Sequence, residues 1–131
     1  MKRYMSILQK SYLQGGKFPN LLEITISRQL EMIAEKYPDR VGLISHHQNA
    51  RLTYEFIFNK AKDIAANLLE LGVKKGDRVG VYAGNGVEWF LTQMACSLAD
   101  VIFVTINPAY KTEELLYCLN QVELNTLITT N

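Results

Sequence analysis

The chain has 131 residues, the length of one domain and enough to bury a hydrophobic core. Apolar residues make up 48% and charged residues 21%, as in ordinary soluble globular proteins. The formal net charge is +1, which gives no electrostatic reason to expect binding to nucleic acid or to an anionic membrane. No apolar run approaches the roughly 20 residues that cross a bilayer.

The first 22 residues are basic and contain no Asp or Glu, which is typical of a mitochondrial presequence or its remnant. Gly15, Gly16 and Pro19 would interrupt a long amphipathic helix in this segment. We therefore expect residues 1–24 to form an ordinary N-terminal arm. We expect a cytoplasmic protein, with the mitochondrial matrix as the alternative. The basic residues of the segment are Lys2, Arg3, Lys10 and Lys17.

Two amphipathic helices are predicted in the first half of the chain. Apolar residues recur three and four positions apart over residues 26–37, and Pro38 ends the pattern. A similar pattern covers residues 57–71. Thr53 is placed to cap this second helix, and Gly72 stands where a left-handed residue commonly ends one.

A β-hairpin is predicted between these helices. The short apolar run at 41–44 and a second strand from Arg51 enclose the polar stretch "SHHQNA". His46 and His47 fall in this turn, and adjacent side chains of an extended chain point in different directions. We expect both histidines to be solvated rather than to share a metal ion.

The second half alternates strand and helix patterns. Strands are predicted at 78–83, 101–106 and 126–129, with helices over 87–98 and from Thr112 onward. Such alternation is typical of an α/β fold, and we expect the three strands to be parallel neighbours in a β-α-β-α-β portion. The side chains expected to face inward from the last helix are Leu115, Leu116, Leu119 and Val122.

The run at 101–106 contains one polar residue, Thr105, and so reads as a strand covered on both faces. The chain stops shortly after the last apolar strand. Domains usually close with a polar tail or a docked helix, so we expect the sheet to be incomplete.

Two cysteines, Cys96 and Cys118, are flanked by apolar residues at helical spacing. Two isolated thiols are too few for a structural metal site, and a secreted disulfide scaffold would be richer in cysteine. We expect both to be buried free thiols in a reducing compartment.

The stretch "GVYAGNGVEWF" at 80–90 raises the question of a phosphate-binding loop. A dinucleotide fingerprint requires a third glycine where this chain has Trp89, and it requires an acidic residue at the end of the next strand, which is missing. The Gly-Lys-Ser/Thr of a Walker loop is also missing. Both points disfavour the alternative that this chain is one half of the nucleotide-binding domain of an oxidoreductase. We instead expect Asn85 to cap the following helix, with Glu88 completing a capping box.

No other residues have the spacing of a catalytic or metal-binding motif. Serines and threonines are scattered without a paired His and Asp. Glu113 and Glu114 open a helix, where the macrodipole favours carboxylates without any catalytic role. We therefore name no catalytic, cofactor-binding or metal-binding residue in this chain.

Several pieces of the sequence resemble one enzyme family. "RLTY" at 51–54, "LGVKKGDRVGVYAGNGVEW" at 71–89 and "VIFVTINPAYKTEELLYCLN" at 101–120 are similar, in order and spacing, to the N-terminal part of AMP-forming acyl-CoA synthetases. This adenylate-forming superfamily also includes luciferases and the adenylation domains of peptide synthetases. "SYLQGG" at 11–16 and "HHQNARLTY" at 46–54 are similar to the subgroup acting on medium-chain fatty acids, the acyl-CoA synthetase family member 2 type. The resemblance covers residues 11–131.

This resemblance implies a two-step reaction in a parent enzyme. A fatty acid carboxylate attacks the α-phosphate of ATP to give acyl-AMP, and coenzyme A then displaces AMP. The family's groups for ATP, Mg²⁺ and coenzyme A lie beyond the part that this chain resembles. Residues 25–131 would form a truncated N-terminal portion of the AMP-binding domain, inactive alone, whose open sheet the remainder of a synthetase chain covers. The alternative is a non-catalytic α/β interaction module that retains the scaffold.

One position departs from the family pattern. Where the family usually has a glycine before the second of the three strands, this chain has Asp100. If that position requires a positive φ, the substitution lowers stability, although Asp tolerates such a conformation better than most residues.

Overall fold

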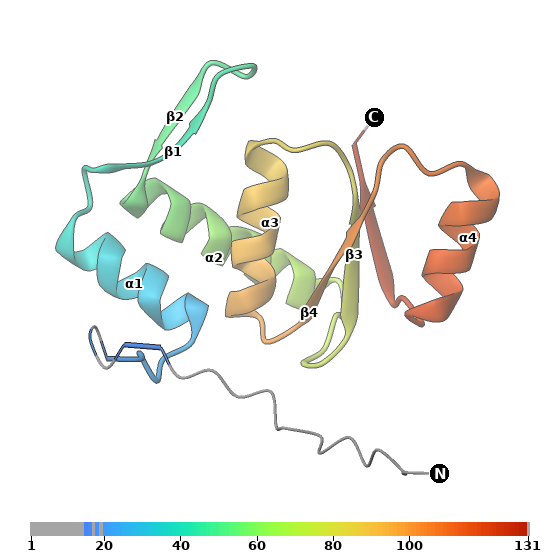
Figure 1. The fold of residues 1–131 in the computed structure, drawn as a ribbon, viewed down its shortest axis with the longest axis horizontal. Coiled ribbons are helices and arrows are strands. Elements are labelled where there is room, and N and C mark those ends of the chain that lie inside the picture. The colour runs from blue at the N-terminus through green and yellow to red at the C-terminus, as the bar shows by residue number, and fades with distance from the viewer. Residues whose placement is uncertain (1–14, 17, 19, 131) are drawn as a thin grey trace, which may run out of the picture.

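The structure is a computed structural model that describes residues 15, 16, 18 and 20–130. The predicted order of elements is confirmed (Figure 1). A helix and a hairpin come first, and a second helix leads into alternating strands and helices. The elements are α1 (Ile26–Lys36), β1 (Val41–Ser45), β2 (Ala50–Thr53), α2 (Tyr54–Glu70), β3 (Arg78–Tyr82), α3 (Val87–Leu98), β4 (Ile102–Ile106), α4 (Thr112–Gln121) and β5 (Thr126–Thr129).

The two sheets have the predicted strand directions. β1 and β2 form an antiparallel hairpin. The larger sheet has the order β4-β3-β5, and both pairings of β3 are parallel. Gly80 in the centre of β3 is paired with Val104 on one side and Leu127 on the other. The three strands are thus members of one parallel sheet, as the intervening helices indicated.

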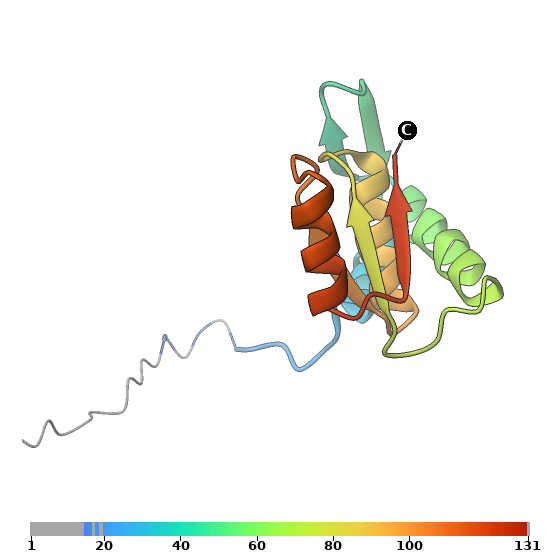
Figure 2. The same cartoon turned by 90° about the vertical axis from the view of Figure 1, so that its right-hand side faces the viewer.

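Helices cover the parallel sheet on both faces. α2 and α3 lie on one side and α4 lies on the other, as Figure 2 shows with the sheet seen between them. This follows from the strand order, because the connection from β3 to β4 and the return from β4 past β3 to β5 run over opposite faces. The strand covered on both faces is β3, where Val79, Gly80 and Val81 are buried.

The expectation that the strand at 101–106 is covered on both faces is wrong. β4 is an edge strand in the described part of the chain, and Ile102 is 49% exposed. The sequence prediction failed because an apolar run reports how well side chains suit an interior, whereas strand order decides which strand is central.

Two buried clusters hold the helices together. One joins α2, α3 and the sheet around Val79 and Cys96. The other joins α1, α2 and α3 around Leu30, Ile57 and Leu91 and also contacts the hairpin. Fully burying a side chain such as Ile57, which is 1% exposed, is worth about 1.5–3 kcal/mol before chain entropy is subtracted. These clusters fix the hairpin and the start of α3 relative to each other.

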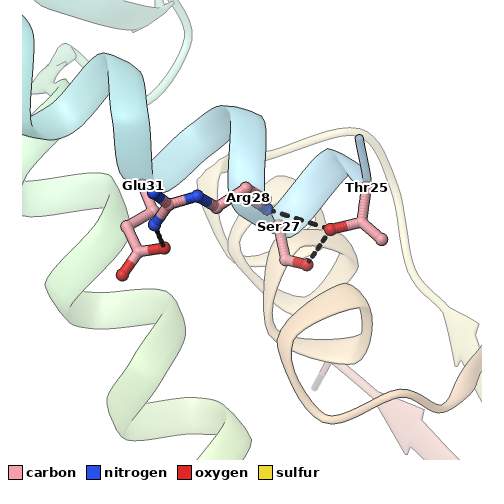
Figure 3. Close-up of polar contacts among 4 residues, drawn as sticks. All are labelled: Thr25, Ser27, Arg28 and Glu31. Carbon is pink, nitrogen blue, oxygen red and sulfur yellow. Dashed lines mark hydrogen bonds and ion pairs between the residues drawn. The ribbon is translucent and has the colours of Figure 1, made fainter. Parts of the chain in front are cut away.

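Helix ends follow local rules at several positions. The Thr25 hydroxyl accepts the Arg28 N–H at the start of α1, and the Arg28 guanidinium pairs with Glu31 one turn on (Figure 3). Thr53 caps α2 by accepting the Phe56 N–H at 3.2 Å, as predicted. Gly72 follows α2 with a φ of 91°, which is also as predicted.

α4 packs less closely than its sequence pattern indicated. None of its residues is buried, and Leu116, expected to face inward, is 52% exposed. Leu115, Leu119 and Val122 are half-buried. In the part of the chain that the structure describes, no helix combines the length and the apolarity needed to cross a membrane.

Candidate functional site

The carboxyl ends of β3 and β4 are the place where an α/β sheet of this kind binds ligands. The loops that leave these neighbouring strands diverge to opposite faces, and such switch points commonly form ligand crevices. A pocket of about 400 Å³ lies at this point. It is lined by Ala83, Asn85, Trp89, Val104, Thr105, Ile106, Asn107, Pro108, Tyr110, Cys118, Gln121 and Val122.

The pocket lining offers neutral polar groups and aromatic rings. Its lining residues include none that carries a formal charge at neutral pH. Tyr82 at the end of β3 fixes one wall, since its hydroxyl lies 3.0 Å from the Pro108 carbonyl oxygen and 2.8 Å from that of Tyr110. The loop after β4 is therefore held against β3 by a side chain rather than by the sheet alone.

Trp89 also lines the pocket. Its indole meets the Phe103 ring edge to face, with ring centroids 5.1 Å apart and an interplanar angle of 84°. A dinucleotide-binding turn needs a glycine at this place so that helix and strand can approach closely. Here an indole that packs against Phe103 of β4 stands at that place. This supports the prediction that the turn at 84–86 is no dinucleotide fingerprint.

The predicted helix cap at Asn85 is wrong. The N-cap of α3 is Gly86, which makes no side-chain capping bond, and Asn85 is exposed. The cap instead comes from the hairpin turn, where Gln48 Oε1 accepts the Val87 N–H at 2.8 Å. Gln48 Nε2 also donates to Glu88 Oε2 at 2.7 Å. Local capping rules could not find this bond, because the two partners are 39 residues apart in sequence.

We call Gln48, Gly86, Val87 and Glu88 the hairpin latch. Ser45 extends it by donating its hydroxyl to Gln48 Oε1 at 2.8 Å. A Cβ on Gly86 would lie 3.2 Å from Gln48 Nε2 and 3.2 Å from Glu88 Oε2, so glycine leaves the space that the amide uses. The latch lowers the pKa of the Glu88 carboxyl, first through its own backbone N–H and then through the Gln48 amide.

The latch bears on whether this turn could hold the phosphates of ATP. The first N–H of α3 already donates to Gln48, and the Glu88 carboxylate stands beside it. A negative charge at the helix start repels phosphate, so the residues present do not fit a phosphate group here.

Within residues 20–130, no group of three or more His, Cys, Asp or Glu side chains has the geometry of a metal site.

The histidines of the hairpin lie where the sequence placed them. His46 and His47 are both exposed in the turn between β1 and β2. The His47 ring Nδ1 lies 3.3 Å from the Ser45 hydroxyl, a local contact within the turn.

The two cysteines differ. Cys96 is fully buried on α3, and burial raises the pKa of its thiol to about 11. Cys118 was also expected to be buried, and this is wrong, because it is half-buried and lines the pocket. Both are free thiols. The expectation failed at Cys118 because α4 packs loosely on the three described strands of the sheet, and none of its residues is buried.

Asp100 adopts the left-handed conformation that the family pattern implied for this position, with a φ of 56°. Its carbonyl accepts the Gly76 N–H at 2.9 Å, and its carboxylate pairs with Lys75 Nζ at 2.9 Å. These bonds join the loop before β3 to the loop before β4, at the end of the sheet where the parallel strands begin. The exposed pair contributes at most about 1 kcal/mol.

Comparison with known proteins agrees with this fold. The chain is similar to the bovine mitochondrial medium-chain acyl-CoA ligase ACSF2, with 38% identity over 118 residues, which is 90% of this chain and 19% of the relative. A fatty acyl CoA synthetase of Mycobacterium tuberculosis matches 80% of the chain with a TM-score of 0.77 and 25% identity, over 21% of that structure. The chain thus spans about a fifth of the length of these relatives.

A third likeness concerns the fold alone. An artificially fused Adenylation-PCP di-domain, NpsA-ThdA of Klebsiella oxytoca, matches 82% of the chain, over 20% of its own length, with a TM-score of 0.77 at 21% identity. The family model described as "AMP-binding enzyme" matches residues 30–131. The match covers both sheets, the hairpin latch and the switch-point pocket, so this chain belongs to the family of AMP-binding enzymes.

Proposed function

We propose that residues 25–131 are the first part of the large domain of a fatty acid–CoA ligase of the AMP-forming type. The observation that carries this proposal is the 38% identity to a medium-chain acyl-CoA ligase along 90% of this chain. The likeness to a fatty acyl CoA synthetase at a TM-score of 0.77 supports it. The parent enzyme activates a medium-chain fatty acid with ATP and transfers the acyl group to coenzyme A.

In this proposal the part described here is a scaffold. We propose that the groups that bind ATP and Mg²⁺ belong to other parts of the parent enzyme and that the 131-residue chain by itself makes no acyl-AMP. The occupied start of α3, which does not fit phosphate, supports this proposal. The rest of a synthetase would complete the parallel sheet and cover the exposed side of β4.

The proposal is tested by exchange of the corresponding segment. Residues 25–131 replace the matching segment of a full-length medium-chain ligase, and pyrophosphate release is measured with octanoate, ATP and Mg²⁺. We expect the chimera to retain octanoate-dependent turnover and the 131-residue chain alone to remain at the buffer blank. A folded chimera without turnover would contradict the proposed scaffold role. Turnover by the chain alone would show that its own residues carry the chemistry.

We propose the cytoplasm as the compartment, with the mitochondrial matrix as the alternative. The mitochondrial designation of the bovine relative supports the second. The basic residues on which the choice depends, Lys2, Arg3, Lys10 and Lys17, all lie outside the described part of the chain. Fusing residues 1–24 to a fluorescent protein distinguishes the two, because only a presequence carries its cargo into mitochondria.

A further inference from the structure

Asn85 is the one asparagine of the 131-residue sequence that is followed by a glycine. Both residues lie in the turn between β3 and α3, and the Asn85 side chain is exposed. The turn is also uncrowded just before it, since a Cβ on Gly84 would meet nothing within 4 Å. Asparagine is among the chemically labile residues of proteins, and its reactivity depends on the residue that follows it.

The two groups that would react are free of hydrogen bonds. No residue that the structure describes is hydrogen-bonded to the Asn85 side-chain amide or to the Gly86 N–H. The groups around them are engaged, because the Gly86 carbonyl accepts the Phe90 N–H at 3.2 Å and the Val87 N–H donates to Gln48. Gly86 has no Cβ to shield its nitrogen from the preceding side chain. Rotation about the bonds of Asn85 can therefore bring the nitrogen to the side-chain carbon.

We propose that Asn85 is a site of spontaneous deamidation through a cyclic imide formed with Gly86. The Gly86 nitrogen loses its proton to hydroxide and attacks Asn85 Cγ. The new N–Cγ bond replaces the Cγ–Nδ2 bond, and Nδ2 takes up a proton from water and leaves as ammonia. Water then opens the ring. Cleavage between the ring nitrogen and Cγ gives aspartate, and cleavage between that nitrogen and the main-chain carbonyl carbon gives isoaspartate.

Both products change the turn. Aspartate puts a negative charge into the lining of the switch-point pocket, whose lining residues carry no formal charge at neutral pH. Isoaspartate inserts one carbon into the main chain between Asn85 and Gly86, which displaces Gly86 relative to β3. Because Gly86, Val87 and Gln48 belong to the hairpin latch, we expect this product to weaken the bond between Val87 and Gln48.

Most other asparagines of the described chain lack a free partner for this reaction. In a helix, the N–H after the asparagine is bonded within the helix. Pro108 has no N–H, so Asn107 cannot close the ring in this way. The Asn125 Oδ1 accepts the Arg78 N–H at 2.8 Å, which holds that amide in place. The helical asparagines are Asn59, Asn67 and Asn120.

Two further asparagines provide matched controls. Asn20 and Asn49 are exposed, as Asn85 is. They are followed by Leu21 and Ala50, whose Cβ atoms stand beside the nitrogen that would attack. A comparison of these three positions separates the effect of the following glycine from the effect of exposure.

The experiment incubates the purified 131-residue chain at several pH values and follows its peptides by mass spectrometry. Replacement of the side-chain NH₂ by OH raises the peptide mass, and labelling by an isoaspartyl methyltransferase detects isoaspartate. We expect the Asn85 peptide to gain mass first and with isoaspartate, and its rate to rise with pH because the attacking nitrogen must lose a proton. The peptides of Asn20 and Asn49 should lag behind. Asn85→Gln requires a larger ring and should show no gain at this position, with circular dichroism showing that it is folded.

Two further measurements test the site in its surroundings. The aged chain should unfold at a lower urea concentration than the aged Asn85→Gln variant, because isoaspartate weakens the latch. The chimera of residues 25–131 in a full-length ligase should also gain isoaspartate at Asn85, which shows that the turn stays accessible in a longer enzyme. Retention of the Asn85 amide in the chain or in the chimera overturns the proposal. A rate that does not depend on pH, an equally fast gain at Asn20 and Asn49, or equal urea midpoints also overturns it.

Discussion

Gln48 at the tip of the β1–β2 turn caps α3 across 39 residues of sequence, by accepting the Val87 N–H at 2.8 Å. The first N–H groups of a helix have no partner within the helix, so a side chain from elsewhere can satisfy one of them. The same amide donates to Glu88, and the hairpin is thereby held at the start of α3.

The first prediction separates this non-local cap from the local one. Gln48→Ala should lower the free energy of unfolding by about 1 kcal/mol, because it leaves the helix start without its acceptor. Asn85→Ala should change it by less than about 0.5 kcal/mol, because the Asn85 side chain is exposed and is not the cap. Urea unfolding of both variants measures the difference. An equal effect at the two positions would contradict the latch.

The second prediction concerns acid pH. The pKa of Glu88 is lowered from its ordinary value of 4.5, so the folded state binds this proton less readily than the unfolded chain. The stabilising contribution is therefore complete above 4.5 and is lost as the pH falls through the lowered pKa. The Glu88→Gln variant should lose less stability than the unchanged chain over this interval. Urea unfolding midpoints of both proteins, measured over a series of pH values, check this prediction. If the midpoints of the two proteins fell by the same amount at acid pH, the prediction would be wrong.

The third prediction concerns close packing in β3. A Cβ on Gly80 would lie 2.8 Å from a Leu124 methyl carbon and 3.0 Å from one of Ile106. Gly80→Ala should therefore cost about 1–3 kcal/mol of stability, as overpacking does. Gly84→Ala is the matched control, since a Cβ there meets nothing within 4 Å. Thermal unfolding compares them, and an unaltered midpoint for Gly80→Ala would contradict the tight approach of the chain after α4 to β3.

The fourth prediction tests the strain at Asp100. At a φ of 56° an alanine is disfavoured, and Asp100→Ala also removes the pair with Lys75, so we expect a loss of about 1 kcal/mol. Asp100→Gly removes the same pair but relieves the strain, and its stability should lie above that of Asp100→Ala. The order of the two variants in urea unfolding is the measurement. The reverse order would mean that the backbone does not prefer glycine here.

The fifth prediction uses the unequal cysteines. Iodoacetamide at neutral pH should modify Cys118 in the folded chain, because that thiol is half-buried at the pocket. Cys96 should react only after unfolding, because it is fully buried and its pKa is raised to about 11. Mass spectrometry of peptides from native and urea-unfolded protein measures both sites. Equal labelling in the native state would show that α3 does not protect Cys96.

The sequence by itself determined the elements, the parallel direction of the main strands and the family. Helical periodicity, Thr53 as a cap and Gly72 as a terminator are local signals, and local signals act between residues close in sequence. The same holds for the dinucleotide fingerprint, which Trp89 in place of a glycine and the missing acidic residue after the next strand both disfavoured. Asp100 could be marked as strained only because a family pattern showed glycine there.

Tertiary structure alone decided which strand is central, which helix face is buried and what caps α3. An apolar run is equally compatible with the middle and the edge of a sheet, so 101–106 could be placed only once β3 was found between β4 and β5. Leu116 is exposed and Cys118 is only half-buried, since α4 packs on a sheet that has three strands in the described part of the chain. Gln48 reaches Val87 because packing of α1, α2 and α3 brings the hairpin to the helix start, and a contact between residues so far apart in sequence leaves no periodic signal in either segment.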